Sequence, residues 1–200
     1  VSINIGKYYK DGKLREATAW GVYNAGSNKN LFLKDGLRFY DERPDFFSYF
    51  NGYNYRLMES VDMTKIDLYL KHIREVIADN DEIVYNFILD WVSFIFQNIS
   101  GKTGIALVIT GKQGTGKNIF TNEICNLMKR YSNPNVSNID NVIGKFNVAI
   151  ENMKLIVCNE MTSAETNKYL NSDALKTVTT ENVLDINQKN EPVRTIENVV

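Results

Sequence analysis

Apolar residues recur at different spacings along the chain, and the changes in spacing divide it into three parts. The middle part is residues 61–104. Thr64 is a candidate N-cap for a first helix in this part, and residues 79–81 end that helix. A second, strongly apolar helix follows. The apolar positions are Ile66, Leu70, Ile73 and Ile77 in the first helix and Ile83, Phe87, Ile88, Trp91, Phe94 and Ile95 in the second. This part therefore predicts a helical subdomain.

Residues 1–60 are rich in aromatic residues, and turn signals such as Asp11-Gly12 and Asn51-Gly52 interrupt them. Short β-prone segments lie at 19–23, 31–33 and 37–40. We expect a loop-rich β segment, or a linker from an upstream domain. Its aromatic side chains are expected to fill a small core rather than to stack on bases.

Residues 105–200 alternate apolar runs with helical patterns, and this alternation predicts a parallel sheet flanked by helices. Runs 105–109 and 153–159 predict buried strands, and 166–177 predicts a helix. A helix with Ile119, Ile124, Leu127 and Met128 on its buried face is expected to end at 131–135, and 138–146 to form a short helix or a loop. Segments 183–187 and 193–196 predict a β-hairpin. The predicted fold class is α/β.

The composition is that of a globular protein, and it limits the candidate functions. The 200 residues are 44% hydrophobic and 24% charged, and the net charge of −1 provides no general basic surface for nucleic acid. Cys125 and Cys158 stand in apolar surroundings, which indicates buried thiols rather than a disulfide framework or a zinc site. The one histidine, His72, lies in a helical pattern and is interpreted as structural. No apolar run reaches the roughly 20 residues of a membrane span.

The most informative motif directly follows the run at 105–109. It reads Gly-Lys-Gln-Gly-Thr-Gly-Lys-Asn, and an apolar-periodic helix comes after it. A strand, a glycine-rich loop and a helix in this order are typical of a P-loop, in which backbone N–H groups and a lysine surround phosphate groups. The alternative is an ordinary glycine-rich turn, which does not explain the lysine. The expected ATP-binding residues are Gly111, Lys112, Gln113, Gly114, Thr115, Gly116, Lys117, Asn118 and Ile119.

A second motif completes the predicted site. The apolar run 155–158 ends in Asn159-Glu160, where a nucleotide hydrolase needs an acidic group beside magnesium. We expect Glu160, Lys117 and Asn159 to be catalytic, and Asn118 and Glu160 to hold Mg²⁺, partly through water. Asn118 and Asn159 stand where a hydroxyl and a carboxylate are common. The site is therefore either an active ATPase or a nucleotide site without turnover, and an ordinary strand end is the third alternative.

With these motifs in place, roughly residues 50–200 resemble the superfamily 3 helicase domains of poxvirus-type primase-helicases and their relatives in phages, plasmids and large DNA viruses. The similar elements are the 51–53 segment, the Trp91 helix, the loop ending in Asn118, Gly144-Lys145-Phe146-Asn147 before the Glu160 strand, Leu175-Lys176 followed by Thr179-Thr180-Glu181, and Lys189.

This resemblance implies an AAA+-like fold that acts as a hexameric ring on single-stranded DNA. It implies DNA contacts by Lys176 and Lys189, for which the alternative is two solvated lysines. Many members of that family are fused to a primase-polymerase module, and whether one precedes Val1 stays open at this point. The resemblance also implies a cytoplasmic location in an infected host cell, and a sensor residue and an arginine finger beyond Val200. Arg194 does not match that finger. We therefore expect a fragment of a longer protein, truncated within residues 105–200, that hydrolyses ATP poorly by itself.

Three functions follow from these patterns. The first is an ATP-dependent DNA helicase module of a viral or phage replication protein. The second is a nucleotide-binding assembly module with weak or no hydrolysis, because Asn118 and Asn159 weaken the metal site. The third is a small-molecule kinase, and it is disfavoured because only Arg130 and Lys145 are basic between residues 130 and 150.

Overall fold

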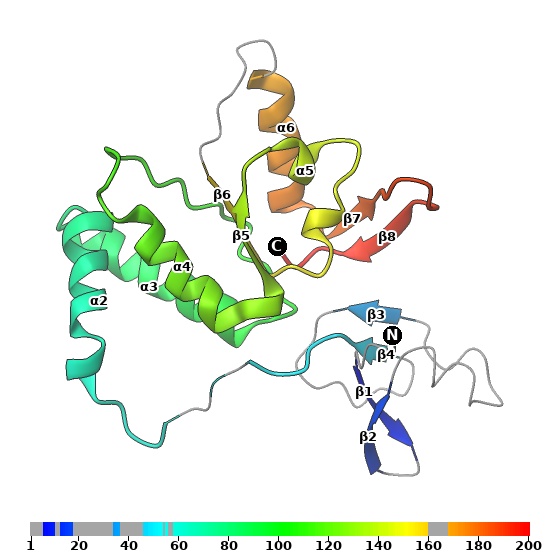
Figure 1. The fold of residues 1–200 in the computed structure, drawn as a ribbon, viewed down its shortest axis with the longest axis horizontal. Helices are drawn as coiled ribbons and strands as arrows, with labels where there is room; N and C mark the ends of the chain where they lie inside the picture. The colour runs from blue at the N-terminus through cyan, green and yellow to red at the C-terminus, as the bar shows by residue number, and fades with distance from the viewer. Residues whose placement is uncertain are drawn as a thin grey trace.

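The computed structural model describes residues 6–10, 13–17, 34–36, 46–53, 55, 58–159 and 168–200. These residues form a mixed α/β structure with a small parallel sheet, a helical region and two further groups of β-strands (Figure 1). None of the described helices is long and apolar enough to cross a membrane.

The amino-terminal strands form one four-stranded sheet with the order β2-β1-β4-β3. β1 (Gly6–Lys10) pairs antiparallel with β2 (Lys13–Ala17), on either side of the predicted turn at Asp11-Gly12. β3 (Lys34–Gly36) and β4 (Phe46–Ser48) pair in parallel. A β segment is therefore confirmed, but the β-prone segments predicted at 19–23, 31–33 and 37–40 lie outside the described residues.

The predicted helical pair is present, and its first helix is less regular than expected. A single 3₁₀ turn, η1 (Met63–Lys65), precedes α2 (Asp67–His72), and the helix continues as one π-helical turn, η2 (Ile73–Ile77). The prediction that Thr64 is the N-cap is wrong. The carboxylate of Asp62 caps η1 instead by accepting the Thr64 N–H at 3.1 Å, because an extended residue just before the turn can reach that donor.

The second helix, α3 (Glu82–Gln97), is confirmed, and Asp81 caps it by accepting the N–H groups of Ile83 and Val84. Its buried side chains are Tyr85, Ile88 and Ile95. Ile83, which the apolar pattern included, is 81% exposed. Periodicity alone therefore overestimates the buried face.

The predicted strand at 105–109 is wrong. Residues 105–110 pair with no strand in the described part of the chain, and Val108 is 85% exposed. Trp91 Nε1 of α3 donates a hydrogen bond of 3.2 Å to the carbonyl oxygen of Ile105, and Ile109 packs against the helical core. An apolar run predicts a buried segment, but a strand requires a neighbour to complete its hydrogen bonds.

The helix expected after the glycine-rich segment is α4 (Lys117–Met128). Ile124 and Met128 lie on its buried face as predicted, together with Phe120 and Cys125. Ile119 and Leu127 do not, since they are 56% and 47% exposed. The buried face is therefore rotated from the one that the spacing predicted.

The parallel sheet contains β5 (Ser132–Val136) and β6 (Leu155–Cys158). β6 confirms the strand expected within 153–159. β5 was missed, because 131–135 reads as a helix end with Pro134. β6 is the one described strand that pairs with β5, so the missing N–H of Pro134 does not interrupt hydrogen bonds to a strand on the other side. The register of the β5–β6 pair shifts between Asn133 and Val136. The 3₁₀ turn η3 (Lys129–Tyr131) joins α4 to β5.

Helix α5 (Asp140–Ile143) and the 3₁₀ turn η4 (Val148–Ile150) lie between the two parallel strands in sequence. After β6 come α6 (Lys168–Thr180) and the antiparallel hairpin of β7 (Val183–Ile186) and β8 (Arg194–Glu197). The last helix and the hairpin are thus confirmed, and of the two alternatives left for 138–146 the structure has the short helix.

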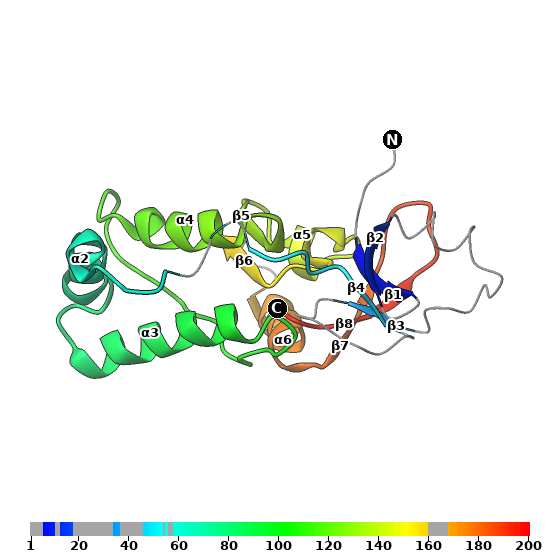
Figure 2. The same ribbon diagram turned by 90° about the horizontal axis from the view of Figure 1, so that it is seen from below.

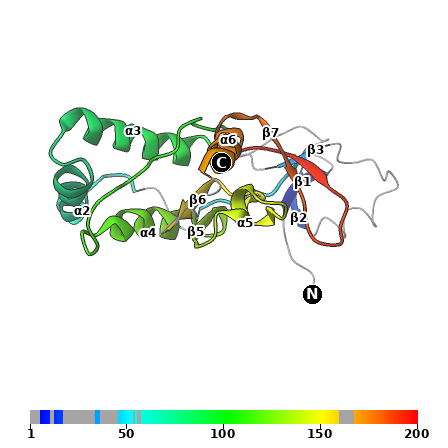
Figure 3. The same cartoon turned by 90° about the horizontal axis from the view of Figure 1, so that it is seen from above.

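Helices cover both faces of the β5–β6 pair. In Figures 2 and 3, α4 and α5 lie on one side and α3 and α6 on the other. One core cluster joins α3, α4 and the α2–η2 helix, and includes Ile73, Ile88 and Phe120. A second joins α5, β5 and β7, and includes Val142 and Ile186. The glycine-rich segment stands at the edge of the first cluster.

The aromatic side chains described between residues 47 and 53 belong to packed clusters. Tyr49, Phe50 and Tyr53 pack against the buried residues Ile99, Tyr131 and Val199. The Tyr131 hydroxyl accepts the Asn51 N–H at 2.6 Å. For this part of the amino-terminal segment, the prediction of core-filling rather than exposed aromatic residues is confirmed.

Candidate functional site

Residues 111–116 form a loop that leads directly into α4. Gly114 and Gly116 have φ angles of 82° and 84°, a left-handed conformation that residues with a Cβ rarely adopt. Space around Gly114 is open, whereas a Cβ on Gly116 would lie 2.7 Å from Cε1 of His72. Gly116 is thus required both by its backbone conformation and by a close neighbour.

The side chain of Lys117 turns back and joins the two ends of this loop. Its Nζ donates hydrogen bonds of 2.9 Å to the carbonyl oxygens of Gly111 and Lys112, and a longer one of 3.4 Å to Oγ1 of Thr115. The Thr115 hydroxyl in turn donates to the Lys112 carbonyl at 2.9 Å. A positive charge is therefore held within the loop by neutral acceptors, which a bound anion can replace.

The amino end of α4 adds a second positive feature. Among the described residues no side chain caps this helix, and its first turn contains no acidic residue. The unpaired N–H groups and the helix dipole therefore favour an anion at this end. Together with the lysine, the uncapped helix makes the loop suitable for a phosphate or carboxylate group.

The helical pair contacts the same end of α4. The Tyr69 hydroxyl donates a hydrogen bond of 2.8 Å to the carbonyl oxygen of Phe120, and His72 Nε2 lies 3.1 Å from the carbonyl oxygen of Gly116. Burial, with smaller effects of Glu123 and Cys125, raises the pKa of Tyr69 to about 12. The sequence analysis did not predict these contacts. The paired residues are separated by 51 and 44 positions in the chain, and such separations leave no spacing signal.

The other predicted site residues are only partly placed. Asn118 is exposed in the first turn of α4, next to Lys117. Asn159 follows β6, and its side-chain amide donates to Oδ1 of Asn135 at 3.1 Å. Glu160 lies outside the described residues. Lys117 therefore contacts the start of the glycine-rich loop, Asn118 is its neighbour in sequence, and Asn159 has a partner within β5.

The two predicted DNA-binding lysines are both exposed, and they lie on different elements. Lys176 is on α6 and Lys189 is in the turn between β7 and β8. No hydrogen bond or ion pair involving either side chain occurs among the described residues. The structure therefore brings neither lysine to the glycine-rich loop.

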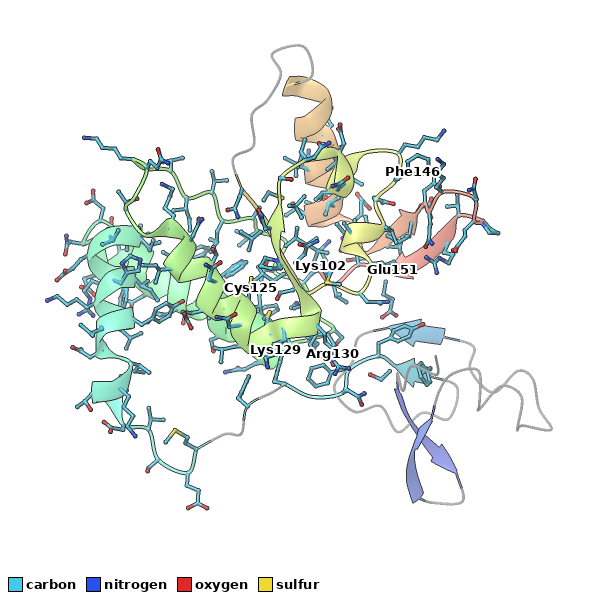
Figure 4. All side chains as sticks on the ribbon, in the orientation of Figure 1. Lys102, Cys125, Lys129, Arg130, Phe146 and Glu151 are labelled. Carbon is cyan, nitrogen blue, oxygen red and sulfur yellow. The ribbon has the colours of Figure 1, made fainter. Side chains whose placement is uncertain are left out.

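The β7–β8 hairpin is held in place by the preceding segment. The side-chain amide of Asn147 donates to the Asp185 carbonyl oxygen and accepts the Asn187 N–H, both at 2.9 Å. Arg194 forms a 2.9 Å ion pair with Glu151, which lies beside the hairpin in Figure 4. These contacts give the Gly144-Lys145-Phe146-Asn147 motif a structural role that the sequence did not reveal.

A buried lysine is the main feature that the motifs missed. Lys154 is 3% exposed, and its Nζ donates hydrogen bonds to the carbonyl oxygens of Gly101 and, at 3.2 Å, of Val199. Burial, and to a smaller extent the nearby Lys102, lowers the pKa of Lys154 to about 8. Lys154 stands in an apolar run, and nothing in the sequence shows which carbonyl groups face it.

The described cysteines have the expected surroundings only in part. Cys125 is buried in α4 and Cys158 is half-buried at the end of β6, and neither forms a disulfide. Burial raises the pKa of both thiols. The described residues include no cluster of three or more His, Cys, Asp or Glu side chains that could hold a metal ion.

The elements and the loop together define a mixed α/β protein with a glycine-rich loop at the amino end of a helix. Residues 109–200 match the model of a protein family described as "Family of unknown function (DUF5906)". The matched range includes the loop, α4, the parallel strands and the hairpin.

The chain is also similar to a DNA primase-polymerase of Nitratiruptor phage NrS-1, with 29% identity over 136 residues, or 67% of this chain and 18% of that protein. Apo structures of the NrS-1 C-terminal region share its fold. One has a TM-score of 0.67 at 19% identity and another a TM-score of 0.62 at 20% identity. Each match covers 96% of this chain and about half of the solved chain. The similarities support a relationship to a phage replication protein.

Proposed function

We propose that the loop at 111–117 binds the phosphate groups of ATP. The observation that carries this proposal is the Lys117 ammonium, which bonds to the carbonyl oxygens of Gly111 and Lys112 at 2.9 Å. An ammonium group gains more from a charged phosphate than from neutral carbonyl oxygens. The uncapped amino end of α4 supports the same ligand.

The neighbouring residues are compatible with magnesium. The side-chain oxygen of Asn118 is a hard ligand of the kind that Mg²⁺ accepts, and it is exposed one residue after Lys117. We assign the second ligand, partly through water, and the catalytic acid–base role to Glu160. Mg²⁺, when bound, would neutralise charge on the phosphate oxygens. In this proposal Asn159 completes the catalytic set.

The proposed function of the whole protein is an ATP-dependent DNA helicase of phage replication, which moves along single-stranded DNA as a hexameric ring in the cytoplasm of the infected cell. The similarity to a phage DNA primase-polymerase supports it, and we propose a fused primase-polymerase module for the same reason. Lys189 in the exposed hairpin turn and Lys176 on α6 are the proposed DNA contacts, because lysines can hold phosphates without reading bases.

The test is ATP binding and hydrolysis by Lys117→Ala. We expect calorimetry to show loss of ATP binding, because the loop loses the ammonium group within it. Lys71→Ala is the matched control and should keep ATP binding, since it removes the same charge from an exposed ion pair with Glu75 outside the loop. Unchanged ATP affinity in Lys117→Ala would refute the proposed loop function.

A specific observation favours a second function, a nucleotide-binding assembly module without turnover. The Asn159 side chain is bonded to Asn135 and carries no charge for a metal. Hydrolysis measured on the full-length protein, with and without single-stranded DNA, separates the two. Hydrolysis that DNA stimulates supports the helicase, whereas ATP binding without hydrolysis in either condition supports the assembly module.

A further inference from the structure

His72 stands against the glycine-rich loop rather than within the helical core. It is the last residue of α2, and its half-buried ring has Nε2 at 3.1 Å from the carbonyl oxygen of Gly116. A carbonyl oxygen can only accept, so Nε2 carries a hydrogen and donates it. The same carbonyl accepts the N–H of Ile119 at 2.9 Å. Two donors thus fix the peptide group from which α4 begins.

The ring also packs against the Cα of Gly116. A Cβ placed there would lie 2.7 Å from Cε1 and 3.3 Å from Nε2 of His72. Gly114 has nearly the same φ angle, yet a Cβ there would meet nothing within 4 Å. His72 therefore selects glycine at 116 through contact, in addition to the selection by backbone conformation that both glycines share.

We propose that His72 is a positioning residue of the nucleotide-binding loop. By holding the Gly116 carbonyl and filling the space beside its Cα, the imidazole keeps the peptide groups before Lys117 turned toward the phosphate position. The proposal rests on the proposed ATP-binding function. It connects the helical pair to the loop, so that a movement of α2 changes the shape of the phosphate site.

Tyr69 provides a built-in comparison. It lies one turn before His72 on α2 and also bonds to α4, but its acceptor is the Phe120 carbonyl, beyond the loop. Each side chain makes one hydrogen bond from α2 to a backbone carbonyl group. Only loss of the His72 bond releases the loop itself.

The experiment compares His72→Phe, His72→Gln and Tyr69→Phe in the complete chain. Phenylalanine keeps the ring without the donor, and glutamine supplies an N–H donor at a similar reach. We expect His72→Phe to weaken ATP binding about three- to tenfold, the loss typical of one hydrogen bond. His72→Gln should restore most of the affinity, and Tyr69→Phe should leave it unchanged. A purely structural histidine would instead lower the melting temperature and leave the affinity as it is.

Amide hydrogen exchange provides a readout that needs no nucleotide. In His72→Phe, exchange at 111–117 should become faster, while the second half of α4, from Ile124 to Met128, keeps its rate. If the unchanged protein binds no ATP, the proposed function fails, and exchange still decides the role of His72. Equal exchange and equal ATP affinity in His72→Phe and the unchanged protein would overturn the proposal.

A pair of glycine variants tests the contact independently. Gly114→Ala and Gly116→Ala introduce similar backbone strain, but only the second places a Cβ against His72. We expect Gly116→Ala to accelerate loop exchange more than Gly114→Ala does, and the excess to shrink when His72 is also changed to alanine. An excess of the same size in both backgrounds would show that His72 does not act on Gly116.

Discussion

The buried Lys154 should make the stability of this protein depend on pH in a defined direction. Its pKa is lowered to about 8, mainly by burial. Between pH 8 and the ordinary lysine value of 10.5, the folded chain has released this proton and the unfolded chain still holds it. The unfolded state binds more protons, so the free energy of unfolding rises with pH.

The lowered pKa should raise the free energy of unfolding by about 3 kcal/mol over the whole range. About 2 kcal/mol of this rise should occur between pH 7 and about pH 9.5. The assay is urea unfolding followed by circular dichroism at several pH values in this range. We expect most of this rise in the free energy of unfolding to be absent in Lys154→Met. Lys71→Met, which removes an ammonium from an exposed ion pair with Glu75, is the control and should keep it.

Absolute stability at pH 7 is a weaker test of the same reasoning. Lys154→Met relieves the burial of a charge, but it leaves the carbonyl oxygens of Gly101 and Val199 without this donor, at a cost of roughly 1–3 kcal/mol each. These effects oppose one another. The cysteine thiols, whose pKa values burial raises, act in the opposite direction but equally in both proteins. The same pH dependence of the free energy of unfolding in Lys154→Met and in the unchanged protein would therefore refute the reasoning.

Two further predictions concern residues that the proposed helicase uses. Glu160→Gln should keep ATP binding and remove hydrolysis in the full-length protein, because the amide cannot accept a proton from the attacking water; retained turnover would place the catalytic acid elsewhere. Lys189→Ala should weaken single-stranded DNA binding and reduce the slope of log affinity against log salt by about 0.7, the value for one phosphate contact. An identical slope would assign Lys189 to the solvated surface.

The elements predicted with most success are those whose own sequence contains the signal. Helix α3 follows from its long apolar period, and the β7–β8 hairpin follows from two β-prone runs with a polar turn between them. Strand β6 follows from a continuous apolar run. In each case local backbone preference and the pattern of burial agree.

The failures occur where a distant neighbour decides the outcome. Residues 105–109 are apolar enough for a strand, but no described strand stands beside them. Strand β5 contains Asn and Pro residues and becomes a strand because β6 pairs with it. Ile119 was assigned to a buried face, and the packing of α4 on the helical pair leaves it exposed.

The candidate chemistry could be read from local sequence: a glycine-rich loop, the lysine after it and the helix that follows have an order and a spacing that do not depend on distant residues. The tertiary structure alone decided which groups surround this loop. Lys117 bonds back to the start of the loop, His72 reaches it from 44 residues away, and Lys154 joins two carbonyl groups from distant segments. Contacts of this kind depend on how elements pack, and packing leaves no periodic signal in the chain.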